Sequence, residues 1–558
     1  MLPIKENTIE ALKKLEEFIG TTPWKDTYLN QIRAMGFQIT EPCTLAVAGR
    51  VKVGKSSFIN ALLEDDLALV GNTETTATIN VFRYGDPPFP EKPVKCTLQN
   101  GRITWESRAF LDSLQGHSVE VLQRAADIKF LEFYVKSPLL ANNIRLVDTP
   151  GIGAYVPEDI HEKRTSDYFK LNETLRNRHT SETIALSADA DAVIYLTDHV
   201  IQACDADFLG KFQEKSRAGG NAGTAINILG IIAQADRSSK LMGTVDEKKE
   251  FIRTEGGLLA EQLEIPVQVL SISAGLQRAL ERFPEEYLSR LQNQLHNGFS
   301  PAAFDLAITG NDREFCDDDL PTSLSAAERM EILRTFSGTP WSVLKIILSV
   351  LFQSENIAGA VSELNGKSGF PALLEVLEKH FFARGEMLRC HTVITTVLRF
   401  LFELKNCIIY QYDEQIRNDQ KDYPDFLDFI FSHPDFPSNP AGKKLQLFLE
   451  RAIPESSPIK ELVPKLDELT DEFLSIKNVL DYDKDNFEGL LFIENNPSCV
   501  TEEEMKELWE LFEARTTLDR ATVCGRELYW RAARQYATSS ARRMLCELAE
   551  KQYQRKNR

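Results

Sequence analysis

The fold of this chain is decided by the stretch Gly49-Arg-Val-Lys-Val-Gly-Lys-Ser56, which fits the phosphate-binding pattern Gly-x-x-x-x-Gly-Lys-Ser. Glycines let the backbone approach a phosphate, and its N–H groups with the next helix N-terminus attract the anion. An apolar strand pattern at residues 45–48 precedes the loop, and a helical pattern at residues 56–63 follows it. A chance Gly-Lys-Ser would lack these neighbours. The sequence therefore predicts a nucleotide site between a strand and a helix.

The loop is expected to supply most of the contacts to the nucleotide. Lys55 should reach the β- and γ-phosphates, and Ser56 should bind Mg²⁺. Lys52 is either a cation near the bridge between those phosphates or a solvated loop lysine, and the residues alone leave both interpretations open. The predicted nucleotide-binding residues of the loop are Gly49, Arg50, Val51, Lys52, Val53, Gly54, Lys55, Ser56 and Ser57.

A second motif, Asp148-Thr-Pro-Gly151, follows an apolar strand at residues 144–147. An aspartate at a strand end can hold the water shell of Mg²⁺, and the Gly151 N–H can contact the γ-phosphate. Ile152 comes next, so the glutamine that positions water in Ras-like enzymes is absent there. Between the two motifs, Thr76 is predicted to complete the Mg²⁺ shell, with Thr75 as the alternative. The predicted catalytic set is Lys52, Lys55, Ser56, Thr76 and Gly151, and the predicted metal ligands are Ser56, Thr76 and Asp148.

Base recognition is predicted where the apolar residues 226–233 end. A guanine site usually carries Asn/Thr-Lys-x-Asp, and here Asp236 is present while Gln234 replaces the lysine. Asp236 either pairs with guanine or caps a helix, and its place after a buried strand favours guanine. The predicted base site comprises Gln234, Asp236, Arg237, Ser273 and Ala274.

The hydrophobic pattern predicts an α/β domain with a doubly wound, mostly parallel sheet. Asn100-Gly101 between two short strand patterns indicates a hairpin. This domain is expected to span residues 41–385, with a helical insert at about 276–365 and a last helix over 373–382. Further apolar strand patterns lie at residues 128–135, 192–196 and 267–272.

Both ends of the chain read as helical. Residues 7–20 form an amphipathic pattern whose Asn7 and Glu10 have capping-box spacing, and a second helix is expected up to about residue 35. The basic end, residues 526–558, carries nine Arg and Lys against three Glu. We expect it to pack on the chain's own acidic surface, with anionic lipid as the alternative. The aromatic segment 423–436 is either core or a membrane contact at a stalk tip.

The composition narrows the classes of function. The chain has 558 residues and a net charge of −19, from 64 basic and 83 acidic side chains, which argues against a nucleic-acid partner. Its nine scattered cysteines fit neither a zinc site nor a disulfide framework. No signal-peptide pattern and no run of eighteen apolar residues is seen. We expect a cytoplasmic protein or one that is peripheral at a membrane.

Three segments resemble bacterial dynamin-like proteins: residues 49–63, Thr75-Thr76 followed by 79–85, and residues 147–153. The resemblance implies a large GTPase that uses GTP and Mg²⁺, dimerises across its nucleotide face and acts on membranes in vesicle-related processes. The partner would be a second copy or another dynamin-like chain. Residues 1–40 would pack with a helical neck, and residues 386–558 would form neck and stalk. Gln234 departs from the family's pattern.

Two other functions are compatible with the residues. One is a switch-type GTPase whose helical half is a protein-binding arm without a lipid role. The other is a degenerate nucleotide-binding member of a hetero-assembly with low turnover of its own, which the departure at Gln234 favours.

Overall fold

The computed structural model describes residues 4–50, 53–65, 78–114, 124, 127–149, 190–197, 228–244, 246–254, 268–382, 384–419, 458–495, 499–513 and 519–557. These residues form two compact units. We call residues 4–41 and 386–483 the helical unit. The nucleotide unit comprises the described residues between 42 and 385 together with 484–557.

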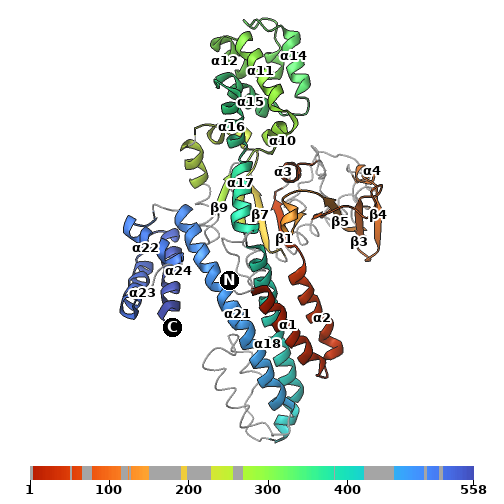
Figure 1. Cartoon of the computed structure of the whole chain (residues 1–558), viewed down its shortest axis with the longest axis vertical. Helices are drawn as coiled ribbons and strands as arrows, with labels where there is room; N and C mark the ends of the chain where they lie inside the picture. Colours follow the sequence, from red (N-terminus) through yellow and green to blue (C-terminus); the bar gives the residue numbers. More distant parts are fainter. Residues whose placement is uncertain are drawn as a thin grey trace, which may run out of the picture. The chain divides into compact units, whose positions relative to one another are not determined.

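A single sheet forms the centre of the nucleotide unit (Figure 1). The order of its described strands is β4-β3-β5-β2-β6-β1-β7-β8-β9. Five of its eight pairings are parallel, which confirms the doubly wound, mostly parallel sheet expected from the sequence. The strands are β1 (Cys43–Gly49), β2 (Asn80–Tyr84), β3 (Val94–Leu98), β4 (Ile103–Glu106), β5 (Ile128–Val135), β6 (Ile144–Asp148), β7 (Ala192–Thr197), β8 (Ile228–Ile232) and β9 (Gln268–Ser271).

Strand β1 lies inside the sheet and is buried along its whole length. It pairs in parallel with β6 on one side and β7 on the other, with Val47 opposite Asp148 and Gly49 opposite Leu196. Parallel strands covered on both faces need continuous apolar runs, and Cys-Thr-Leu-Ala-Val-Ala-Gly provides one. The pairing brings the carboxyl ends of β1, β6 and β7 to one edge of the sheet.

Strand β2 was not predicted from the sequence pattern. It pairs in parallel with β5 and antiparallel with β6, so both of its partners come later in the chain. Its five residues alternate polar and apolar only briefly, and Arg83 is partly exposed while Tyr84 is exposed. Neighbouring strands, rather than local periodicity, determine this element.

The predicted capping box at Asn7 and Glu10 is wrong. Helix α1 (Ile4–Gly20) begins one turn earlier, so Asn7 lies inside it. Ile4 packs against the core of the helical unit, and that contact extends the helix beyond the local cap signal. Helix α2 (Lys25–Thr40) likewise runs past the expected end near residue 35, because Ile39 is buried in the same core.

The segment between β9 and residue 369 is entirely made of helices and their connections, and we call it the insert. It has its own apolar core, with Phe304, Phe315 and Leu348 fully buried. Ser325 and Glu328 form the expected capping box. Its helices are α10 (Ala274–Arg282), α11 (Glu285–Gly298), α12 (Pro301–Thr309), α13 (Asp312–Phe315), α14 (Ala326–Thr335), α15 (Trp341–Gln353) and α16 (Ile357–Ser368).

The chain leaves the insert through Gly369 and enters α17 (Phe370–Val376). The Phe370 ring packs on Phe58 of α3 (Lys55–Leu63), with ring centroids 6.1 Å apart. The helix expected over residues 373–382 is interrupted, because residues 377–382 form a π-helical turn. The segment after the insert therefore supports the helix that follows the phosphate-binding loop.

The helical unit packs α1 and α2 along α18 (Gly385–Asp419) and the first part of α21 (Pro458–Asn495) (Figure 1). Leu15, Val397 and Phe473 are fully buried in its core. Lys405 pairs with Asp467 across the bundle, and His391 contacts Asp481 with 3.1 Å between Nε2 and Oδ1. These contacts bring the N-terminal helices together with α18 and α21 in one core.

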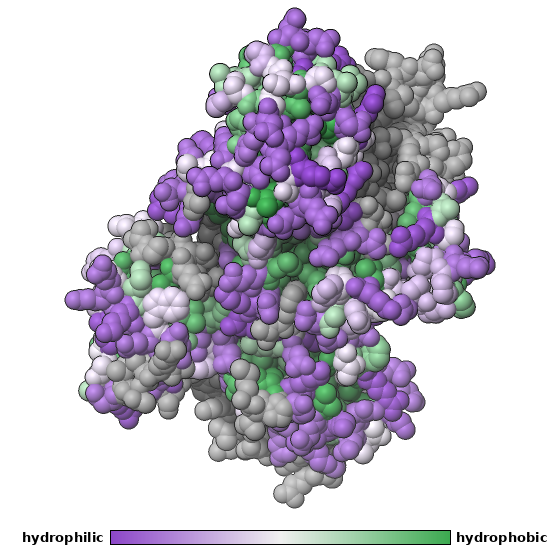
Figure 2. Space-filling model, turned by 45° about the horizontal axis from the view of Figure 1, so that its top comes forward, coloured by the Kyte–Doolittle hydropathy of each residue, from purple (hydrophilic) through white to green (hydrophobic). Residues whose placement is uncertain are grey.

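Hydrophilic side chains cover most of the described surface in the view of Figure 2, with smaller apolar areas between them. Within the described residues, none of the helices is both long enough and apolar enough to cross a membrane. The aromatic segment 423–436 lies outside the described residues.

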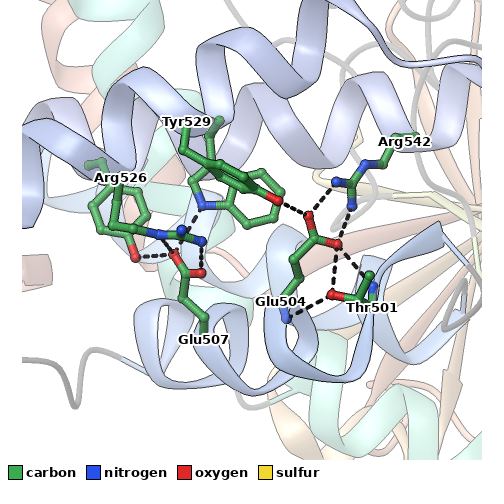
Figure 3. A network of polar contacts seen from close by, with 8 residues as sticks. Thr501, Glu504, Glu507, Arg526, Tyr529 and Arg542 are labelled. Atoms are coloured by element: carbon green, nitrogen blue, oxygen red, sulfur yellow. Dashed lines mark hydrogen bonds and ion pairs between the residues drawn. The ribbon is translucent and has the colours of Figure 1, made fainter.

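The basic end of the chain belongs to a small helical module with α22 (Glu502–Phe512), α23 (Arg520–Gln535) and α24 (Ser540–Asn557). Trp530 is fully buried in its core. Arg526 pairs with Glu507 and Arg542 with Glu504 (Figure 3). Lys551 and Arg555 both pair with Asp485 in the C-terminal part of α21. The expectation that the basic end packs on acidic side chains of the chain itself is confirmed for these pairs.

Glu504 is the most heavily engaged carboxylate of this module. It accepts hydrogen bonds from Arg542, the Thr501 backbone N–H and the Tyr529 hydroxyl, whose oxygen lies 2.6 Å from Oε1 (Figure 3). Burial alone would raise the pKa of Glu504, but these donors outweigh it and lower the pKa from 4.5 to about 2. The folded state therefore favours the ionised form.

We expect Glu504→Gln to lower the melting temperature of the protein at pH 7, while Glu503→Gln, on the exposed side of α22, changes it little. A group whose folded pKa is depressed stabilises the protein above its unfolded pKa and loses that effect as the pH falls through the folded value. The difference between parent and Glu504→Gln should thus shrink from pH 4.5 towards pH 2. Thermal scans across this range check it, and a difference independent of pH would contradict it.

Candidate nucleotide site

The two glycines of the phosphate-binding loop are required by its backbone. Gly49 has φ of +152°, and a Cβ there would lie 2.3 Å from the Leu196 carbonyl oxygen. Gly54 has φ of +99° and is the left-handed residue directly before α3. Arg50, Val53, Ser56 and Ser57 are described in the same loop and helix start, while Val51 and Lys52 lie outside the described residues.

The side chain of Lys55 is held inside the loop. The residue is 6% exposed, and its Nζ donates to the carbonyl oxygens of Gly49 at 3.1 Å and Arg50 at 2.9 Å. Burial lowers its pKa to about 8, and the charge of Asp148 opposes that shift. An anion bound in the loop would offer this ammonium stronger acceptors than two carbonyl groups.

Asp148 ends β6 next to the loop and is fully buried. Asn80 donates to Oδ2 at 3.4 Å, whereas Oδ1 has no hydrogen-bond partner within the described part of the chain. Burial raises the pKa of Asp148 to about 6, and Lys55 and Asn80 oppose this. A buried carboxylate oxygen without a donor suits a divalent cation or its bound water, so the residues present fit Mg²⁺.

Two neighbours of Asp148 complete this edge of the sheet. The Thr149 hydroxyl donates to the Val47 carbonyl at 2.8 Å, which fixes the turn after β6 against β1. Asn80, the first residue of β2, faces Asp148 through the antiparallel register of β2 and β6. Sequence analysis missed Asn80 because β2 itself carries little local signal. The predicted residues Thr75, Thr76, Gly151 and Ile152 lie outside the described residues.

The predicted base-site residues come together at the ends of β8 and β9. Ala235 donates its N–H to the Ile272 carbonyl, and the Ser273 hydroxyl donates to Asp236 Oδ1 at 2.7 Å. The backbone of Gln234 adopts the left-handed conformation, and the side-chain Nε2 lies 3.6 Å from the position that a Gly54 Cβ would occupy. The site thus adjoins the phosphate-binding loop. Ala274 begins α10, and Arg237 is exposed.

The structure bears on the alternative role of Asp236 as a helix cap. The next helix, α8 (Ser239–Met242), is capped by Ser238, whose hydroxyl accepts the Leu241 N–H. Asp236 instead accepts from Ser273 and from Ser342, whose hydroxyl oxygen lies 2.9 Å from Oδ2. Ser342 was not foreseen, because it lies 106 residues along the chain, in the insert.

Comparisons with known proteins agree with this arrangement. Residues 45–221 match the Dynamin family. The isoniazid-induced protein IniC of Mycobacterium tuberculosis is 27% identical over 384 residues, which cover 66% of this chain and 69% of IniC. Dynamin-like protein 1 of Campylobacter jejuni is 26% identical over 204 residues, covering 30% of this chain and 28% of that protein.

Similar solved structures include an oligomerised bacterial dynamin pair, at 16% identity and a TM-score of 0.28, covering 92% of this chain and 79% of that one. LeoA, a bacterial dynamin GTPase from ETEC, has 11% identity and a TM-score of 0.25, covering 95% and 76%. A specific relationship to LeoA is a prediction from the sequence motifs.

Residues 45–221 contain both the phosphate-binding loop and Asp148, so the family match covers the phosphate side of the site, and the base-site residues lie beyond it. The match over residues 45–221 and the bacterial relatives together support a bacterial dynamin-like GTPase.

Proposed function

We propose that this protein binds GTP with Mg²⁺ at the loop of residues 49–57, hydrolyses it, dimerises through its nucleotide face and remodels or tethers a membrane. The observation that carries the proposal is the pair of buried, opposite charges at one sheet edge. Lys55 and Asp148 end up there because β1 and β6 are parallel neighbours.

The residues divide the work of phosphoryl transfer to water. Lys55 would bind the β- and γ-phosphate oxygens, and the hydroxyl groups of Ser56 and Thr76 would bind Mg²⁺. Asp148 would accept hydrogen bonds from the water molecules bound to Mg²⁺. Mg²⁺ bound there would neutralise part of the charge on the phosphates. The Gly151 N–H would orient the γ-phosphate, and Lys52 would oppose charge that develops towards the leaving group.

Guanine recognition would depend on Asp236. A carboxylate accepts up to about four hydrogen bonds, so two hydroxyl donors leave acceptor sites for the N1–H and 2-amino groups of guanine. The Ser273 hydroxyl donates to this carboxylate, and Ala274 follows Ser273 as the first residue of α10. Gln234 would cover the base edge where the family's pattern has a lysine.

Assembly and membrane action are supported by the family and by one feature of the sequence. With Ile152 in place of the usual glutamine, the attacking water needs another positioning group, which a second nucleotide face can supply by ordering the loops around Thr76 and Gly151. The partner would be a second copy or another dynamin-like chain, and the protein would work in the cytoplasm or peripherally at a membrane. The departure at Gln234 supports a second candidate, a partner-dependent member with low turnover of its own.

We expect Lys55→Ala to abolish binding of GDP and GTP, because it removes the buried ammonium of the loop. Lys92→Ala, an exposed lysine of the same unit, is the matched control and should bind normally. Titration with a fluorescent guanine nucleotide measures both. A folded Lys55→Ala protein with unchanged affinity would overturn the assignment of the loop.

Asp236→Asn should cost at least tenfold in GDP affinity, since it removes an acceptor for two guanine donors, in line with roughly 1.5–3 kcal/mol for a hydrogen bond to a charged group. Xanthosine diphosphate should bind the variant better than the parent, because its 2-oxo group accepts from the new amide. Competition titrations with GDP, XDP and ADP test this. Equal binding of adenine and guanine nucleotides by the parent protein would show that Asp236 does not select the base.

Turnover should depend on assembly. We expect GTP hydrolysis per chain to rise with protein concentration, and to rise further with anionic liposomes or a partner chain that concentrate the subunits.

Lys52→Ala should lower the maximal rate more than the nucleotide affinity, because the proposed charge acts in the transition state. A rate strictly proportional to enzyme and insensitive to lipid and to Lys52→Ala would favour a simple switch GTPase. Intact binding without turnover in any condition would favour the partner-dependent candidate.

A further inference from the structure

We propose that Ser342 is a positioning residue for base recognition and makes the insert part of the guanine site. The inference rests on the proposed guanine-binding role of Asp236. Ser342 is the second residue of α15, and its hydroxyl donates to Asp236 Oδ2 at 2.9 Å. The Ser273 hydroxyl holds the other oxygen at 2.7 Å. Two donors from separate elements therefore fix the orientation of one carboxylate.

Each donor is itself held in place. The Ser273 hydroxyl also accepts the N–H of Leu276, as the cap of α10. Ser342 is placed by its neighbours, because Val343 is fully buried and the indole N–H of Trp341 donates to the Gly310 carbonyl at 2.9 Å. A Cβ at Gly275 would lie only 3.0 Å from Val343 Cγ2, so glycine there allows α15 to come close to the first turn of α10, next to Ser273.

The two ends of the insert meet at the base-site residue Ser273. The Ser273 N–H donates to the Ser368 carbonyl at 2.9 Å, which joins the beginning of the insert to its end. Gly369 has φ of +78°, and a Cβ there would lie 2.2 Å from the Ser271 carbonyl oxygen. Only glycine fits this backbone and this approach. The insert thus contacts the base site at its start, at its end and, through Ser342, at Asp236.

This arrangement has a consequence for binding. If guanine takes the remaining acceptor sites of Asp236, the base and α15 share one carboxylate. Loss of the Ser342 hydroxyl should leave the carboxylate of Asp236 held by Ser273 alone and less well oriented, and guanine affinity should fall. If Ser342 only supported the fold, replacing it would lower guanine affinity by the same factor with and without the Asp236 carboxylate. Non-additivity with Asp236 therefore separates the two roles.

The test is a double-mutant cycle with GDP as the probe. We expect Ser342→Ala to weaken GDP binding by about three- to tenfold, the effect of one hydrogen bond. In an Asp236→Ala background, which keeps the phosphate contacts, the same change should have less than about a twofold effect. The separate variant Ser342→Thr should retain most of the GDP affinity of the parent, because threonine keeps the hydroxyl group. Ser349→Ala, about two turns further along α15, is the matched control.

Three results would overturn the inference. Ser342→Ala indistinguishable from Ser349→Ala would show that the hydroxyl has no part in binding. An equal loss in both backgrounds would show that Ser342 does not act through Asp236. If Asp236→Ala alone left GDP affinity unchanged, the proposed base site would fail as well, and this outcome is distinguishable because it does not involve Ser342.

Discussion

The parallel pairing of β1 with β6 and β7 is the constraint on which the site depends. It places Gly49 against the Leu196 carbonyl and sets Val47 opposite Asp148, so the phosphate-binding loop and the carboxylate must leave the sheet at the same edge. The cost of burying Lys55 and Asp148 is seen in their pKa values, which move towards the neutral forms. A bound nucleotide would offer Lys55 stronger acceptors than its two carbonyl groups, and Mg²⁺ or its water would give Asp148 Oδ1 a partner.

Two segments outside the sheet contact the elements that form the site at this edge. The segment after the insert supports α3 through the ring contact of Phe370 with Phe58. The insert approaches from the base side and reaches Asp236 through Ser342. The acidic helix α22 forms ion pairs with the basic helices α23 and α24, because Glu507 pairs with Arg526 and Glu504 with Arg542. Their charges consequently serve the module's own packing.

The parts of the fold that local pattern controls were predictable. The loop, the hairpin at Asn100-Gly101 and strand β5 follow from glycine placement and apolar runs, and each was expected at its observed place. What escaped prediction depends on partners distant in the chain: β2 with Asn80, the earlier start of α1, and Ser342. No local period encodes such contacts. The predicted roles of Thr76, Gly151 and Lys52 concern residues outside the described ranges and stay predictions.

The central claim is that a guanine nucleotide binds at the edge of β1 and β6 together with Mg²⁺. Calorimetric titration of the full chain with a non-hydrolysable GTP analogue, with Mg²⁺ and then with excess chelator, tests it most directly. The account predicts one site per chain and a marked loss of affinity without Mg²⁺, because the buried Asp148 carboxylate would then lie beside the phosphates without a cation between them. Absence of binding, or an affinity that ignores Mg²⁺, would contradict it.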